Sequence, residues 1–165
     1  MIKKIKLNSN SISVLIPDVL RSACVFSLPH SGREYSSEFK SSTELDYMTL
    51  RNSEDFFLDN FFEIAVKNGS SLIKANFPRA FLDLNREPYE LDPDMFSQTL
   101  PDFINSTSKK VALGLGTIPR VVSNGAEIYK NKLSWLEAEN RIENFYFPFH
   151  MNLKQLLIKV STKQK

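Results

Sequence analysis

The sequence has little cysteine, little histidine and little glycine. One cysteine, two histidines and five glycines occur in 165 residues. A single thiol forms neither a disulfide framework nor a cysteine-based zinc site. We expect Cys24 to be a small, buried core residue. The net charge of +2 does not indicate a nucleic-acid or strongly anionic partner.

Long apolar segments are also lacking. Lysines near the amino terminus are followed by the apolar patch Val14–Ile16, which Pro17 and Asp18 interrupt. This patch is well short of the roughly 7–15 apolar residues of an export signal. No stretch approaches the roughly 20 apolar residues of a membrane span. We therefore expect a soluble, cytoplasmic protein without a membrane or nucleic-acid partner.

Two common catalytic motifs are absent as well. The segment Gly114-Leu115-Gly116 lacks the third glycine of a dinucleotide fingerprint and the Gly-Lys-Ser/Thr of a phosphate loop. We expect it to form a tight backbone turn. No serine or cysteine lies in a recognisable nucleophile elbow.

What the sequence does contain is an alternation of predicted strands and helices. Short apolar runs bounded by proline or glycine predict strands, and apolar residues at helical spacing predict helices. The expected strands cover residues 23–28, 71–75, 109–113 and the region around 121–122, after an edge strand or hairpin within 1–20. The order predicts an α/β fold in a single domain, residues 1–165.

The first expected helix begins at Ser53, with Glu54 and Asp55 in its first turn, and ends at Gly69 as a left-handed cap. Its predicted buried face contains Phe57, Leu58, Phe61, Ile64 and Ala65. A capping box at Ser134 begins the last helix, which Pro148 should kink or restart.

The turn after strand 23–28 presents His30 where ligands bind in open α/β sheets. A hydrolytic zinc site takes three ligands from histidine, aspartate and glutamate. His30 is one candidate, and Glu34, Glu54 or Asp55 could supply a second. Simpler explanations are a turn histidine bonded to the backbone and carboxylates that stabilise a helix start.

A second group of residues favours anion binding. Arg79 and Arg86 flank a short segment, and Asn85 lies beside Arg86. Guanidinium groups bind carboxylates in a bidentate fork, and an amide adds a neutral donor. Asp83 could orient one of the cations. A surface salt-bridge network would explain the same residues.

Together these motifs resemble the N-formylglutamate amidohydrolase family. The matching segments occur in the family's order and cover the chain from about residue 23 to about residue 150. They are Pro29–Tyr35, Ser53–Asp55, Phe77–Ala80, Asp83–Arg86, Glu90–Phe96, Gly114–Val121, Ile128–Tyr129 and Tyr146–His150.

The resemblance implies a phosphorylase/hydrolase-like α/β fold, with a mixed sheet and flanking helices, related to zinc carboxypeptidases and aspartoacylases. Members of the family hydrolyse N-formyl-L-glutamate to formate and L-glutamate in histidine degradation. The resemblance implies that His30 binds zinc together with Asp55 or Glu54, of which we favour Asp55. It further implies that Arg79 polarises the scissile carbonyl.

The resemblance also implies that Asn85 and Arg86 hold the α-carboxylate of a small acidic substrate. The family's later part, which begins with a strand ending in Asp-x-His-Ser and brings a third zinc ligand and a general acid/base, has no counterpart here. His150 belongs to the preceding segment and is not expected to replace that ligand. We therefore expect the C-terminal strands to be lacking, zinc binding to be weak and hydrolysis to be impaired by truncation.

Two alternatives remain. The chain could be one part of a split enzyme, completed by a complementary C-terminal chain along the missing core strand. It could instead be a non-catalytic binding module for acidic amino acids that uses Arg79, Asn85 and Arg86.

Overall fold

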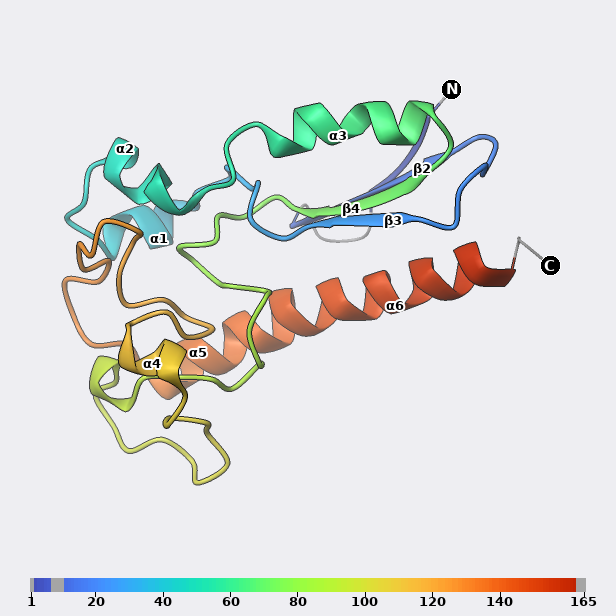
Figure 1. Ribbon diagram of the computed structural model, residues 1–165. Coiled ribbons are helices and arrows are strands. Elements are labelled where there is room, and N and C mark those ends of the chain that lie inside the picture. The colour runs from blue at the N-terminus through green and yellow to red at the C-terminus, as the bar shows by residue number, and fades with distance from the viewer. Residues whose placement is uncertain (1, 7–10, 163–165) are drawn as a thin grey trace.

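The structure, a computed structural model, describes residues 2–6 and 11–162 (Figure 1). In these residues four strands form one sheet in the order β1-β2-β4-β3. β2 pairs antiparallel with both β1 and β4, whereas β3 pairs parallel with β4. The strands are β1 (Ile2–Lys6), β2 (Ile12–Pro17), β3 (Val25–Leu28) and β4 (Ser71–Ala75). The predicted α/β class, with a mixed sheet, is confirmed.

Two helices cover the two faces of the sheet (Figure 1). α3 (Leu58–Lys67) contacts β2, β3 and β4, and α6 (Phe147–Thr162) contacts β3 and β4 from the other side. Alternate strand residues point to opposite faces. Accordingly, Val14 packs in the larger cluster with α6, and Leu15 packs with α3.

The other helices are short and lie in the connections. They are α1 (Ser37–Ser41), α2 (Tyr47–Leu50), a 3-10 turn (Arg51–Ser53), a second 3-10 turn (Pro93–Met95), α4 (Lys109–Ala112), α5 (Trp135–Arg141) and a π-helical turn (Ile142–Tyr146). α5, the π-helical turn and α6 follow one another without a break.

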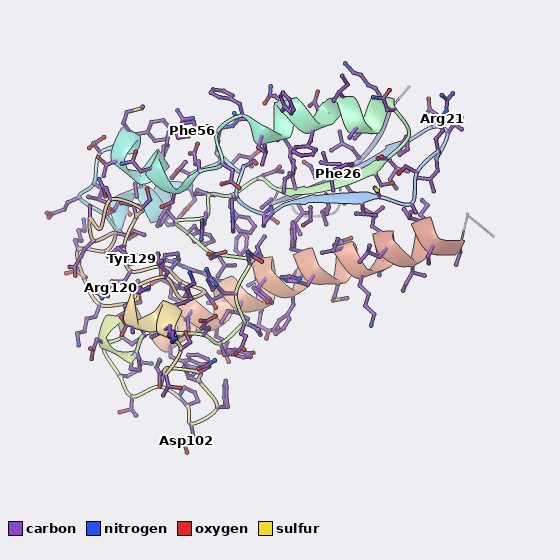
Figure 2. All side chains as sticks on the ribbon, viewed as in Figure 1. Arg21, Phe26, Phe56, Asp102, Arg120 and Tyr129 are labelled. Atoms are coloured by element: carbon purple, nitrogen blue, oxygen red, sulfur yellow. The ribbon has the colours of Figure 1, made fainter. Side chains whose placement is uncertain are left out.

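The prediction that residues 23–28 form a buried core strand is wrong in its burial. β3 is an edge strand of the described sheet and has one neighbour there, β4. Ser27 is exposed, whereas Phe26 packs against Phe62 of α3, with ring centroids 4.9 Å apart (Figure 2). Cys24, expected in the core, is exposed just before this strand. A short apolar run does not distinguish a central strand from an edge strand.

The predicted start and buried face of the first long helix are also wrong. α3 begins at Leu58, after Phe57 in a left-handed conformation with φ of 55°. The predicted inner side chains of Phe57, Phe61 and Ile64 are 60–76% exposed. Asp59 turns inward instead, where its carboxylate accepts hydrogen bonds from Arg33 and Lys74. The face of α3 that is turned toward the protein is therefore the one that carries Asp59.

Other predictions have mixed outcomes. β4 and the left-handed Gly69 after α3, with φ of 95°, are as predicted. Ser134 caps α5 by accepting a hydrogen bond from Glu137 N–H at 3.1 Å. Residues 109–113 form the helical turn α4, not a strand, because Ser108 caps it. No helix within residues 2–6 and 11–162 is long and apolar enough to span a membrane.

Candidate active site

The segments that follow β3 and β4 carry the predicted site. Parallel strands end at the same edge of a sheet, so the turn at His30 lies next to the segment after β4. Glu34 N–H donates to the Asn76 carbonyl at 2.8 Å. A Cβ atom at Gly32 would lie only 2.0 Å from the Phe77 carbonyl oxygen. Position 32 therefore requires glycine.

The carboxylate of Asp83, 1% exposed, joins the two segments. His30 Nε2 lies 2.7 Å from its Oδ1, and Asn85 N–H donates to the same oxygen at 2.9 Å. Arg79 donates from Nε to Oδ2 at 3.0 Å, and Arg86 Nε lies 3.6 Å from Oδ2. One buried acid thus holds four of the residues around it.

The charges of these partners decide the ionisation of Asp83. Burial by itself would raise the pKa of this carboxyl group. The hydrogen bond and charge of His30 and the charge of Arg79 outweigh burial, and they hold the pKa below its usual value. Asp83 is therefore a carboxylate at neutral pH.

The position of Asp83 fixes the tautomer of His30. An ionised carboxylate accepts a hydrogen bond, so Nε2 of the neutral imidazole carries the proton and Nδ1 has the free lone pair. Nδ1 lies 3.6 Å from Oδ2 of Asp55, whose side chain is 45% exposed. The Asp55 N–H also donates to the His30 carbonyl at 3.0 Å, which ties the two residues together.

The donor set of His30 and Asp55 fits a metal ion as two of its ligands. A lone pair and a carboxylate oxygen facing each other require a cation or a proton between them. Two ligands of a tetrahedral zinc ion lie about 3.3 Å apart, close to the 3.6 Å seen here. A ligating histidine typically donates its other ring N–H to a carboxylate, as His30 does to Asp83. Within the described residues, however, no cluster of three or more histidine, cysteine or acidic side chains is placed to hold a metal ion.

The structure places Asp55, not Glu54, beside His30. Glu54 is buried and accepts hydrogen bonds from Tyr35 Oη at 2.7 Å and from Arg51 Nε at 3.0 Å. Burial raises the pKa of Tyr35, and the hydrogen bond to Glu54 raises it further. Glu54 therefore serves this separate hydrogen-bonded group, and Glu34 is exposed.

The predicted anion-binding residues come together beside His30. The Arg79 and Arg86 side chains are 27% and 17% exposed, so they are not an open surface network. Arg86 Nε is buried and has no hydrogen-bond partner among the described residues. The Asn85 side chain is exposed next to it. Asp83 thus links both arginines to His30.

From the sequence, Asp83 was expected only to orient one of the two arginines. Its spacing was a usable signal, because it lies four residues after Arg79 and three before Arg86, within reach of both. Its bond to His30 joins residues 53 positions apart and has no local signal. His150 is engaged elsewhere, with Nε2 3.0 Å from the Leu84 carbonyl.

A family model described as N-formylglutamate amidohydrolase matches residues 22–165. The crystal structure of N-formylglutamate amidohydrolase from Ralstonia eutropha JMP134 superposes with a TM-score of 0.83 at 28% sequence identity. The match covers 93% of this chain and 54% of that one, so this chain spans about half of that protein's length. No curated protein matches the chain.

Proposed function

This chain belongs to the N-formylglutamate amidohydrolase family, and we propose on that basis that its site serves the hydrolysis of N-formyl-L-glutamate to formate and L-glutamate. The observation that carries the proposal is the Asp83 carboxylate, which gathers His30, Arg79 and Arg86 around one position. A histidine with a free Nδ1 and two guanidinium groups suit an anionic substrate with a polarisable carbonyl.

We propose that His30 and Asp55 hold a zinc ion. Zinc bound in such a site lowers the pKa of a bound water to about 7 and polarises a carbonyl oxygen. Asp83 keeps the His30 ring oriented and, in the neutral imidazole, holds the ring proton on Nε2, so that Nδ1 offers its lone pair. Asp55 has a half-exposed side chain, which lets it adjust to a bound ion.

Arg79 is the proposed donor to the scissile formyl oxygen. Its Nε and Nη2 both lie 3.0 Å from Asp83 Oδ2, which fixes the plane of the guanidinium group. Nη1 is then left for the oxygen that becomes negatively charged as water adds to the formyl carbon. A positioned donor of this kind contributes about 3–4 kcal/mol to transition-state stabilisation.

Asn85 and Arg86 are the proposed partners of the substrate α-carboxylate. The buried Nε of Arg86 lies 3.6 Å from Asp83 but has no hydrogen bond among the described residues. This supports the assignment, because a ligand carboxylate could supply that hydrogen bond. The exposed Asn85 amide adds a neutral donor. Holding the substrate at this end sets its formyl group against Arg79 and the His30–Asp55 pair.

A specific observation favours a completing partner as a second candidate. A catalytic zinc takes three protein ligands, and the described residues offer two. β3 is an edge strand of the described sheet, and His30 follows its carboxyl end. A strand from a complementary chain that paired parallel with β3 would therefore end beside His30. We accordingly propose that this chain alone binds zinc weakly and turns over slowly.

Glutamate release by the purified full chain tests these proposals. With zinc present, we expect slow release from N-formyl-L-glutamate that is abolished in His30→Ala, and substrate binding by calorimetry that is lost in Arg86→Ala. Binding without turnover at any zinc concentration would favour the binding module. Absence of both binding and turnover would overturn the proposal, and turnover at the rate of a full-length family member would remove the need for a partner.

A further inference from the structure

Two side chains near the beginning of α6 hold the turn that carries Asn85 and Arg86. Tyr146 Oη donates a hydrogen bond to the Arg86 carbonyl at 2.6 Å. His150 Nε2 lies 3.0 Å from the Leu84 carbonyl. A carbonyl oxygen only accepts, so His150 is the donor. The two bonds span 60 and 66 residues of sequence and join the helix to the site segment.

The two side chains act as one unit. They lie four residues apart on a continuous helix, so they share a face. Their rings are 4.4 Å apart and tilted by 36°. Tyr146 is 8% exposed, and partial burial lowers the pKa of His150, against the smaller opposing effect of its bond to Leu84. The pair is thus packed, and neither ring is free to reorient without the other.

Tyr146 and His150 lie where the helix that leads into α6 is irregular. Ile142–Tyr146 is a π-helical turn, and Pro148 is the second residue of α6, which follows it. A π-turn holds one more residue than an α-turn and so changes which side chains face inward after it. Tyr146 is the last residue of this turn. The helix is therefore distorted where it meets the site segment.

The turn itself is held from two sides. Asp83 accepts from the Asn85 N–H at 2.9 Å, and the carbonyls before and after Asn85 are bound by His150 and Tyr146. The backbone at 84–86 therefore has three fixed points within three residues. Only the side chains of Asn85 and Arg86 remain to interact with a ligand.

We propose that Tyr146 and His150 are positioning residues, which set the Asn85 and Arg86 side chains for recognition of the substrate carboxylate. This inference rests on the proposed function of Asn85 and Arg86. It assigns the helical segment Tyr146–His150 a role in substrate specificity, not in metal binding or chemistry. Loss of either hydrogen bond should weaken carboxylate recognition and leave the His30–Asp55 pair intact.

Calorimetry on the full chain tests the specificity. In Tyr146→Phe and His150→Leu we expect N-formyl-L-glutamate to bind roughly tenfold more weakly, the loss typical of one hydrogen bond. Binding of N-formyl-4-aminobutyrate, which lacks the α-carboxylate, should be unchanged, as should zinc affinity. His150→Gln, whose amide can donate to the Leu84 carbonyl, should restore most of the affinity. Equal weakening for both ligands would overturn the proposal.

Tyr129→Phe is the matched control. Tyr129 is a partly buried tyrosine whose hydroxyl accepts a hydrogen bond from Arg141, and its described hydrogen bonds do not involve the 84–86 turn. The Tyr129→Phe variant should have a lower melting temperature but the same preference for N-formyl-L-glutamate over N-formyl-4-aminobutyrate. A general loss of stability is thereby separated from a loss of positioning.

Backbone dynamics give a readout without any ligand. In ligand-free full chain, Tyr146→Phe should increase the nanosecond motion of the Asn85 and Arg86 amides measured by NMR relaxation, and Tyr129→Phe should not. Unchanged motion in Tyr146→Phe would overturn the positioning role. If the wild-type chain binds neither ligand, the proposed function fails, while these relaxation data still decide whether the helix orders the turn.

Discussion

Two aspartates flank His30, and they are built into the protein in different ways. Asp83 is 1% exposed and has His30, Arg79, Arg86 and the Asn85 N–H around it. The side chain of Asp55 is 45% exposed, and its one described side-chain partner, His30 Nδ1, lies 3.6 Å away. We refer to these as the closed side and the open side of the site.

The closed side organises the protein's own side chains, whereas the open side is suited to binding a ligand. On the closed side every oxygen of the carboxylate is used by the protein, so no ligand can replace a partner without a large cost. On the open side an imidazole lone pair and a carboxylate face each other at the surface, which suits an incoming cation. Phe56 and Phe57, which follow Asp55 directly in sequence, are 45% and 60% exposed, and Figure 2 labels Phe56 just before α3.

The largest effect should come from breaking the closed side with Asp83→Ala. Two guanidinium groups would lose their counter-ion and His30 its acceptor, so we expect the free energy of unfolding to fall by about 3–5 kcal/mol. Urea denaturation followed by circular dichroism measures this. Asp83→Asn, which keeps the shape and one acceptor, should lose less and keeps the test usable if the alanine variant does not fold.

Glu127→Ala is the control for the closed side. Glu127 pairs with Arg120 at 3.1 Å, and the Glu127 side chain is 68% exposed. The loss should stay below about 1 kcal/mol, as for exposed ion pairs. Equal losses at Asp83 and Glu127 would remove the distinction between buried and exposed charges.

The next effect concerns zinc on the open side. Asp55→Asn should lower zinc affinity by at least about 100-fold, because it removes a direct ligand and outer-shell changes alone cost 10–100-fold. The melting temperature of the zinc-free chain should stay close to that of the wild type. Competition with a fluorescent chelator measures the affinity.

Glu54→Gln reverses this pattern. It weakens the bonds from Tyr35 and Arg51, so it should lower stability and leave zinc affinity unchanged. If Glu54→Gln abolished zinc binding and Asp55→Asn did not, Glu54 would be the ligand and the open side would have been misassigned.

A third aspartate, Asp59, sharpens the comparison through pH. Burial would raise its pKa, but the hydrogen bond and charge of Lys74 and the charge of Arg33 lower it below the usual value. An acid with a depressed pKa stabilises the fold above about pH 4, and this stability is lost as the pH falls through the depressed pKa. Asp59→Asn should therefore flatten the fall in stability as the pH drops below about pH 4. Parallel pH profiles for variant and wild type would contradict this.

The smallest effect belongs to the outer face of α3. Phe61 is 76% exposed, so Phe61→Ser should change the free energy of unfolding by no more than about 0.5 kcal/mol. Val66, 1% exposed on the inner face, should cost about 1–3 kcal/mol when changed to alanine. A large loss for Phe61→Ser and a small one for Val66→Ala would show that the helix packs as its apolar periodicity predicted.

The helix α3 shows why part of the fold could not be predicted. Its sequence has apolar residues on two faces, and helical spacing fits Leu58, Phe62 and Val66 as well as Phe57, Phe61 and Ile64. The first set packs against strand residues of the sheet, and Asp59 beside it pairs with Lys74 of β4 and with Arg33. These partners are distant in sequence, so the spacing within the helix does not decide between the two faces.

The sequence by itself determined several local features of the fold. β4, the left-handed Gly69, the cap at Ser134 and the turn that presents His30 depend on neighbours within a few positions. The ordered motifs also indicated the family, which the comparisons confirm.

Only the tertiary structure decided how these parts meet. It put β3 at the sheet edge, placed Asp55 and not Glu54 at His30, and gave Asp83 its shared role. It also brought Tyr146 to the turn at Arg86, 60 residues away. Buried charges and hydrogen-bonding groups need partners, and the folded chain supplies these partners from distant segments. The spacing of residues within one segment does not predict such distant partners.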